Sequence, residues 1–197
     1  MVDSWEIDPD SLTLIFMEDH RFDTVAFRRG TFEYAGEVDA KYVPTAYLRI
    51  SEPGMGEEAV AMTLPVFLEP GVITVSCKEL PDEGIFDIRV DGTPSNELMS
   101  DRMSRFIGLN YDMLGVASDS LLTEEQKNER ISSMYMQQDS LLRYFYRDNR
   151  DSPIAPMLAI QQFYGTNDFR EAGEALAELN GRFPGHPDLH DLESVWM

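Results

Sequence analysis

The sequence changes character at Val90-Asp91-Gly92-Thr93-Pro94-Ser95-Asn96-Glu97-Leu98. Thr93 and Ser95 are good helix N-cap residues, and Pro94 suits the first position of a helix. Before this stretch, short β-prone runs alternate with turn residues. After it, apolar residues recur at helical spacing. The pattern predicts a change from strands to helices near residue 92.

The first half is expected to form an antiparallel sheet structure. Its β-prone runs are separated by turn signals, among them Arg29-Gly30, predicted as a hairpin turn, and Glu69-Pro70-Gly71. Short strands with frequent turns are typical of a β-sandwich or an open barrel, here over residues 12–91. The seven expected strands are residues 12–17, 22–27, 31–35, 47–50, 66–68, 72–76 and 85–90.

The second half is expected to form a helical bundle over residues 93–195. Thr123-Glu124-Glu125-Gln126 fits a capping box and predicts a helix start. The fold class is therefore α+β, with residues 1–91 and 92–197 expected to unfold as one cooperative unit. Further helix ends are marked by Ser152-Pro153, Gly165, Asp168 with Glu171, Pro184-Gly185, Pro187 and Trp196.

Composition excludes several classes of function. The 197 residues include 16 Lys and Arg against 36 Asp and Glu, which gives a net charge of −20. So acidic a chain is not expected to bind nucleic acid or anionic membranes. Its one cysteine, Cys77, allows no disulfide and no thiolate metal cluster within the chain. No run is apolar enough to span a membrane, and the first residues do not form a signal peptide. The protein is then cytosolic, or a signal has been removed.

Few residues suggest chemistry of their own. Cys77 follows an alternating strand and is predicted to be a small core residue rather than a nucleophile. His186 and His190 are four apart and could share one helix face as metal ligands, but Pro187 interrupts that face. We therefore expect no metal site and no cofactor. Methionines of the helical half, such as Met103 and Met136, are expected to take part in helix–helix and helix–sheet packing rather than to line a binding groove.

Three segments, in this order, resemble a known family. They are DTVAFRRGTFEYAG at residues 23–36, FLEPGVITV at 67–75 and VDGTPSNEL at 90–98. The chain from about residue 12 to 195 resembles the N-terminal domain of unknown function of bacterial thiol:disulfide interchange lipoproteins. In that family a thioredoxin-like domain of the AhpC/TSA or TlpA type usually follows and carries the paired cysteines. Those cysteines have no counterpart here, so the resemblance implies no catalytic residue.

The resemblance implies a non-catalytic accessory or interaction domain in the cell envelope, with a lipid anchor supplied through an N-terminal signal. The partner would be another protein or a tethered thioredoxin-like domain. The alternative is a stand-alone ligand-binding lipoprotein domain. For either, the expected contact region includes Thr93, Ser95 and Asn96, because a helix N-terminus offers unpaired N–H groups. The simpler interpretation of the same residues is that they cap the helix.

Overall fold

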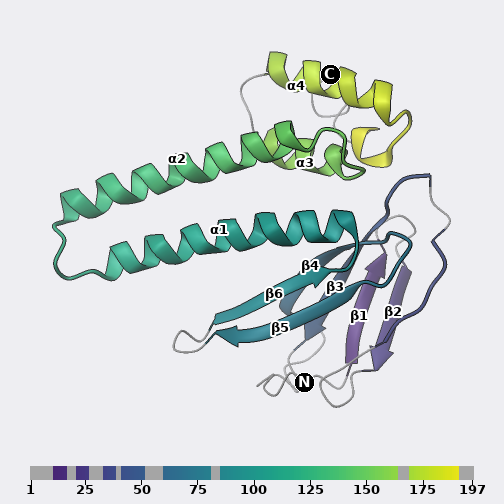
Figure 1. Cartoon of the computed structure of the whole chain (residues 1–197), viewed down its shortest axis with the longest axis horizontal. Helices are drawn as coiled ribbons and strands as arrows, with labels where there is room; N and C mark the ends of the chain where they lie inside the picture. The colour runs from purple at the N-terminus through teal and green to yellow at the C-terminus, as the bar shows by residue number, and fades with distance from the viewer. Residues whose placement is uncertain are drawn as a thin grey trace. The chain divides into compact units, whose positions relative to one another are not determined.

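A computed structural model describes residues 11–16, 21–26, 33–38, 41–51, 60–80, 85–163 and 169–190. It divides into two compact units, Met1–Ser100 and Asp101–Met197, and the boundary falls within the first helix. The fold is α+β, as predicted. The elements, labelled in Figure 1, are β1 Ser11–Phe16, β2 Arg21–Ala26, β3 Thr45–Ser51, β4 Val60–Phe67, β5 Thr74–Leu80, β6 Ile85–Asp91, α1 Pro94–Ser118, α2 Glu124–Asp148, α3 Ala155–Phe163 and α4 Phe169–Arg182.

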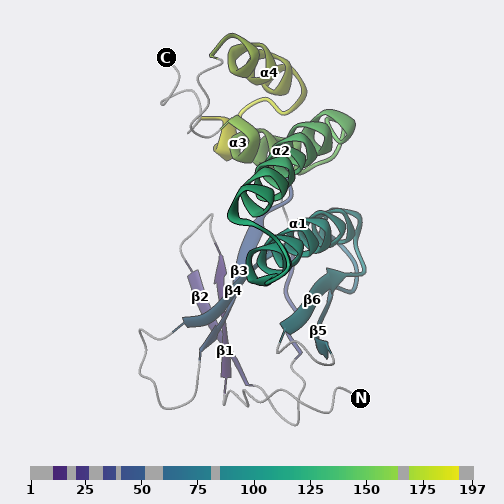
Figure 2. The same cartoon turned by 90° about the vertical axis from the view of Figure 1, so that its left-hand side faces the viewer.

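The strands of the first unit form two antiparallel sheets. One has four strands in the order β2-β1-β3-β4, and the other is the β5-β6 hairpin (Figure 2). Within the described residues, β4 pairs with no strand other than β3. Pro65, which has no N–H to donate, lies in β4 opposite Tyr47. Proline is tolerated on a strand of this kind because one side carries no ladder.

One apolar cluster joins the two sheets. Leu48 of β3 is fully buried, and Val66 of β4 lies beside it in the cluster with Val90 of β6. Alternate residues of β3, Ala46 and Leu48, are buried, whereas the side chains between them are partly exposed. This is the period of two that the sequence shows. Val25 of β2 and Val75 of β5 complete the packing from the outer strands.

The predicted third strand is wrong in its described part. Residues 33–38 have no regular secondary structure, and β2 pairs with β1. Residues 31 and 32 lie outside the described residues. The Arg29-Gly30 turn proposed for that hairpin lies outside the described residues. The alternation of Phe32 and Tyr34 was misleading, because the Tyr34 side chain makes polar contacts: its hydroxyl donates a hydrogen bond of 2.5 Å to Oδ2 of Asp23. Hydrogen bonding to Asp23 raises the pKa of Tyr34.

The starts of α2 at Glu124 and of α3 at Ala155, and the end of α4 at Arg182, lie close to the predicted residues. The ends predicted at Gly165, Asp168 and Trp196 lie outside the described residues. α1 and α2 lie side by side as a helical hairpin (Figures 1 and 2), joined by a hydrogen bond of 2.7 Å from Nε2 of buried Gln138 to Oδ1 of Asn110. Arg102 of α1 is also buried; its guanidinium donates to Oε1 of Gln161 in α3 and lies over the Phe145 ring of α2. Burial lowers the pKa of Arg102. Polar contacts therefore fix α1, α2 and α3 against one another.

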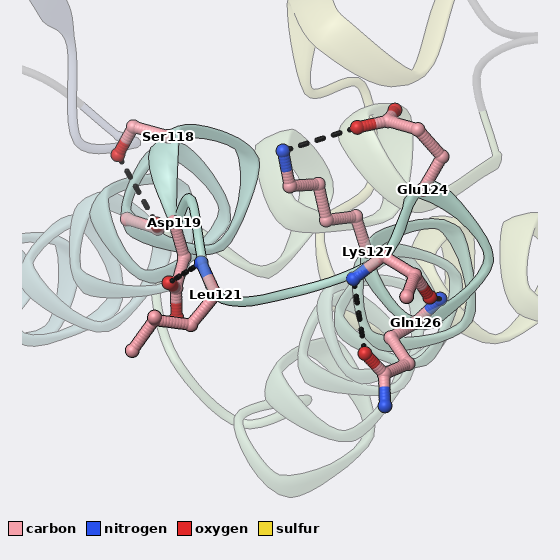
Figure 3. A network of polar contacts seen from close by, with 8 residues as sticks. Ser118, Asp119, Leu121, Glu124, Gln126 and Lys127 are labelled. Atoms are coloured by element: carbon pink, nitrogen blue, oxygen red, sulfur yellow. Dashed lines mark hydrogen bonds and ion pairs between the residues drawn. The ribbon is translucent and has the colours of Figure 1, made fainter.

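The connection between α1 and α2 confirms the predicted capping box. The Thr123 hydroxyl accepts the N–H of Gln126 at 3.3 Å, and the Gln126 side chain accepts the N–H of Thr123 at 3.0 Å. Figure 3 shows this loop from close by, with Oδ1 of Asp119 accepting the N–H of Leu121. Backbone groups that a helix end leaves unpaired are thus satisfied locally.

Among the residues that the structure describes, none of the helices has the length and apolar content needed to cross a bilayer.

We expect Thr123→Ala to lower the free energy of unfolding by about 1 kcal/mol, because it removes the side-chain acceptor of the capping box. Urea unfolding followed by circular dichroism measures this change. Ser132→Ala, an exposed position within α2, is the matched control and should not lower stability. Equal losses in the two variants would contradict the assigned cap.

Candidate functional site

The predicted contact residues lie where the start of α1 meets the edge of β4. The side chain of Asn96 accepts the N–H of Phe67 at 2.9 Å and donates to the carbonyl of Phe67 at 2.7 Å. A carboxamide carries the same donor and acceptor as a peptide group, so Asn96 replaces a neighbouring strand at this point. Only 1% of Asn96 is exposed, and Phe67 is equally buried. The bonds are therefore shielded from water.

Ser100 makes the same kind of contact with the other sheet. Its hydroxyl accepts the N–H of Val90 at 2.8 Å and donates to the carbonyl of Val90 at 2.7 Å. Ser100 lies four residues after Asn96, so both side chains project from one face of α1. One face of the helix start thus satisfies backbone groups of β4 and of β6.

The N-terminus of α1 is capped from a distant turn. Glu69, which follows β4, accepts the N–H of Ser95 at 3.0 Å and its hydroxyl at 2.7 Å. A carboxylate is favoured here because the exposed N–H groups of a helix start carry partial positive charge. Thr93 completes the junction: its hydroxyl accepts a bond of 2.7 Å from Nδ2 of Asn96.

Two glycines let these segments approach. Gly92 has φ +98°, and a Cβ on it would lie 2.2 Å from the carbonyl oxygen of Val72. Gly71 has φ +145°, and its Cβ would lie 3.2 Å from Cγ2 of Thr93. Glycine is required at position 92 both for its backbone conformation and for space. The turn at residues 69–71 and the start of the helix at residues 92–96 therefore form the two sides of one contact.

Thr93, Ser95 and Asn96 lie together at the start of α1, and their side chains form hydrogen bonds within the chain. All three side chains are buried. The geometry gives them a structural role as cap and strand partner. Their role in contacting a ligand or a partner stays a prediction.

The two histidines do not form a cluster of ligands within the described residues. His186 is buried and contacts the ring of Phe183, and its Nδ1 accepts the N–H of Asp188 at 3.3 Å. His190 is exposed at the end of the helical turn 187–190. No group of three or more potential metal-binding side chains occurs in the part of the chain that the structure describes. Cys77 lies in β5 opposite Ile88, and its side chain is outside the described part.

A shallow groove in the second unit carries exposed apolar side chains. It runs between α1 and α2 and has a volume of about 650 Å³. Met136, with 69% of its surface exposed, and Tyr144 line it from α2, and Leu109 lines it from α1. Met99 and Met113 are buried, as expected of packing residues, whereas Met136 and the half-exposed Met103 are not.

Comparison with known proteins concerns the first unit. Residues 8–99, just under half of the chain, match the protein family described as a domain of unknown function (DUF4369). The matched segment contains every described strand and the first turns of α1. No curated protein and no solved structure matches the chain.

Three parts of this junction are not evident from the sequence. Glu69 was assigned only to a turn, although an acidic residue beside a turn is a suitable distant cap for a helix that begins with proline. The target of Asn96 was also missed, because pairing with Phe67 spans 29 residues and depends on the sheet edge. Ser100 gave no signal, since a serine inside a helix usually has no tertiary role.

We expect Asn96→Leu to lower the free energy of unfolding by about 1–3 kcal/mol, because it leaves the buried N–H of Phe67 unpaired and leaves the Phe67 carbonyl with the N–H of Glu69 alone. Denaturant unfolding measures the loss. The neighbouring exposed Glu97 provides a control: Glu97→Gln should stay within about 0.5 kcal/mol of the unaltered protein. An Asn96→Leu variant as stable as that control would contradict the strand-partner role.

His186 should make stability depend on pH. Burial lowers its pKa below the ordinary 6.5, and the charge of Asp188 opposes this only in part. The unfolded chain then binds a proton that the folded chain resists, so the free energy of unfolding falls as the pH drops below 6.5. Melting temperatures between about pH 7.5 and 5.5 test this, since carboxylates stay largely ionised in that interval.

His186→Phe keeps a ring against Phe183 and should flatten the dependence of the melting temperature on pH. His190→Gln, at an exposed position, should retain it. An unchanged slope in His186→Phe would show that another group is responsible.

Proposed function

We propose that this chain is a non-catalytic interaction domain of a cell-envelope thiol:disulfide interchange protein, one that binds or positions a thioredoxin-like domain. The proposal rests on the ordered resemblance of three segments to the N-terminal domain of such proteins. The family match over residues 8–99 contains all three segments. Localisation in the cell envelope is part of the same proposal.

The exposed groove between α1 and α2 is the observation that supports an interaction role. Proteins of this size rarely expose contiguous large apolar side chains unless a partner covers them. Met136 and Tyr144 present apolar surface along α2, and Leu141 extends it along the same helix. Methionine and tyrosine suit a docking surface, because one adapts its shape and the other combines an apolar ring with a polar end.

The first unit would supply a rigid scaffold in this proposal. Two of the three segments that carry the resemblance, residues 67–75 and 90–98, bond to each other at the start of α1, through Glu69 with Ser95 and Asn96 with Phe67. Such residues stabilise a fold rather than react with a substrate. Dithiol exchange also requires a resolving thiol, and the sequence has only Cys77.

The test measures binding of the full chain to a thioredoxin-like domain taken from an envelope protein that carries the same family domain. We expect saturable binding, weakened about tenfold or more by the double change Met136→Ser and Tyr144→Ser, as for residues at the centre of an interface. Tyr135→Ser is the matched control, because Tyr135 is exposed on α2 but does not line the groove.

No saturable binding at concentrations up to about 100 μM would contradict the proposed partner. Equal affinity of the double variant and the control would place the interface elsewhere. The chain itself should reduce insulin in the presence of dithiothreitol no faster than a Cys77→Ser variant, and clear turnover above that variant would overturn the non-catalytic part of the proposal.

A further inference from the structure

The helical unit contains a cavity that the proposed function does not use. It has a volume of about 300 Å³ and lies between α2, α3 and α4. This is the lower end of the size range of small-molecule sites. The residues that line it include Tyr146 of α2, Gln162 of α3 and Ala175 of α4.

Two buried polar atoms at this cavity lack a bonding partner. Tyr146 is only 3% exposed, and its ring packs edge-on against Phe163. No described residue forms a hydrogen bond with the Tyr146 hydroxyl or with Oε1 of Gln162. Buried polar groups are nearly always paired, so an exception at a cavity wall indicates a missing partner. A ligand that both donates and accepts would satisfy the two atoms.

The walls of the cavity carry opposite charges. Three arginines line it, two from the C-terminal part of α2 and one just after that helix, and three glutamates line it from α4. The ion pairs that these residues already make are exposed and of ordinary length: Arg150 lies 3.4 Å from Glu178, and Glu174 lies 2.9 Å from Arg170. Exposed pairs of this kind are weak and can exchange partners. The charged lining residues are Arg143, Arg147, Arg150, Glu171, Glu174 and Glu178.

We propose that this cavity binds a short peptide of dipeptide size in its zwitterionic form. Its amide group would pair with the Tyr146 hydroxyl and with Oε1 of Gln162. Its carboxylate would bind the arginines of α2, and its ammonium the glutamates of α4. The inference rests on the cavity alone and is independent of the proposed interaction with a thioredoxin-like domain.

Other occupants fit less well. A simple anion such as phosphate would meet the glutamates of α4 and the negative field of a chain with net charge −20. An apolar ligand would leave both buried polar atoms unpaired. The Tyr146 hydroxyl stays protonated and able to donate, because burial, with Glu178 adding to it, raises its pKa. A peptide with both termini charged matches each of these groups.

Nuclear magnetic resonance of the full chain titrated with alanyl-alanine tests the proposal. We expect saturable changes in the amide signals of α2, α3 and α4 at peptide concentrations up to about 10 mM, which reveals dissociation constants in the millimolar range. N-acetyl-alanyl-alanine amide keeps the amide groups but carries no charge. It should bind at least about tenfold more weakly, because it loses its pairing with both charged walls.

Two variants identify the buried atoms. Tyr146→Phe removes only the hydroxyl, and Gln162→Leu removes only the amide. Each should weaken binding of alanyl-alanine about tenfold. The melting temperature without peptide should be unchanged or higher, because an unpaired buried group has been removed. Tyr135→Phe, at an exposed site of α2, is the matched control and should change neither quantity.

Absence of saturable signal changes with alanyl-alanine would overturn the proposal, and so would changes confined to other parts of the chain. Equal binding of the capped peptide would show that the charged walls do not select a zwitterion. A lower melting temperature in Tyr146→Phe together with unchanged binding would show that the hydroxyl has a structural partner instead. None of these results would bear on the proposed binding of a thioredoxin-like domain, which is tested separately.

Discussion

The first unit depends on one arrangement: two polar side chains at the start of α1 take the place of missing strands. Asn96 pairs with both backbone groups of Phe67, and Ser100 pairs with both backbone groups of Val90. An open sheet edge otherwise leaves N–H and carbonyl groups that must find water or another strand. All four residues are buried, so these bonds are shielded from water, and the carbonyl of Phe67 also accepts the N–H of Glu69 at 3.1 Å.

This arrangement gives the family segments a physical meaning. The turn after β4 places Glu69 at the N-terminus of α1, and Gly92 lets the chain pass against Val72 before the helix begins. The two segments that look like separate motifs are halves of one contact. A protein that needs a rigid first unit would keep both halves, whatever its partner is. The two candidate binding surfaces lie in the helical unit: the groove lined by Met136 and the cavity lined by Tyr146.

Local features were predictable from the sequence, and long-range ones were not. The start of α1 at Pro94 and the Thr123 capping box follow from backbone chemistry within a few residues, and both are confirmed. The alternation of aromatic and polar residues predicted a strand at Tyr34. Alternation does not report which strands pair, and the Tyr34 hydroxyl instead donates a hydrogen bond to Asp23. The Tyr146 hydroxyl has no hydrogen-bond partner among the described residues, and this results from the packing of α2, α3 and α4. The spacing of apolar residues predicts a helix but does not predict how three helices pack.

Hydrogen exchange at the amides of Phe67 and Val90 is the most direct test of the account. Both N–H groups are bonded to side chains of α1 rather than to a strand. We expect them to exchange as slowly as the amides of β3, a strand paired on both sides, because the same cooperative opening would expose them. Exchange at the rate of exposed, unbonded amides would contradict the claim that the start of α1 seals the two sheets.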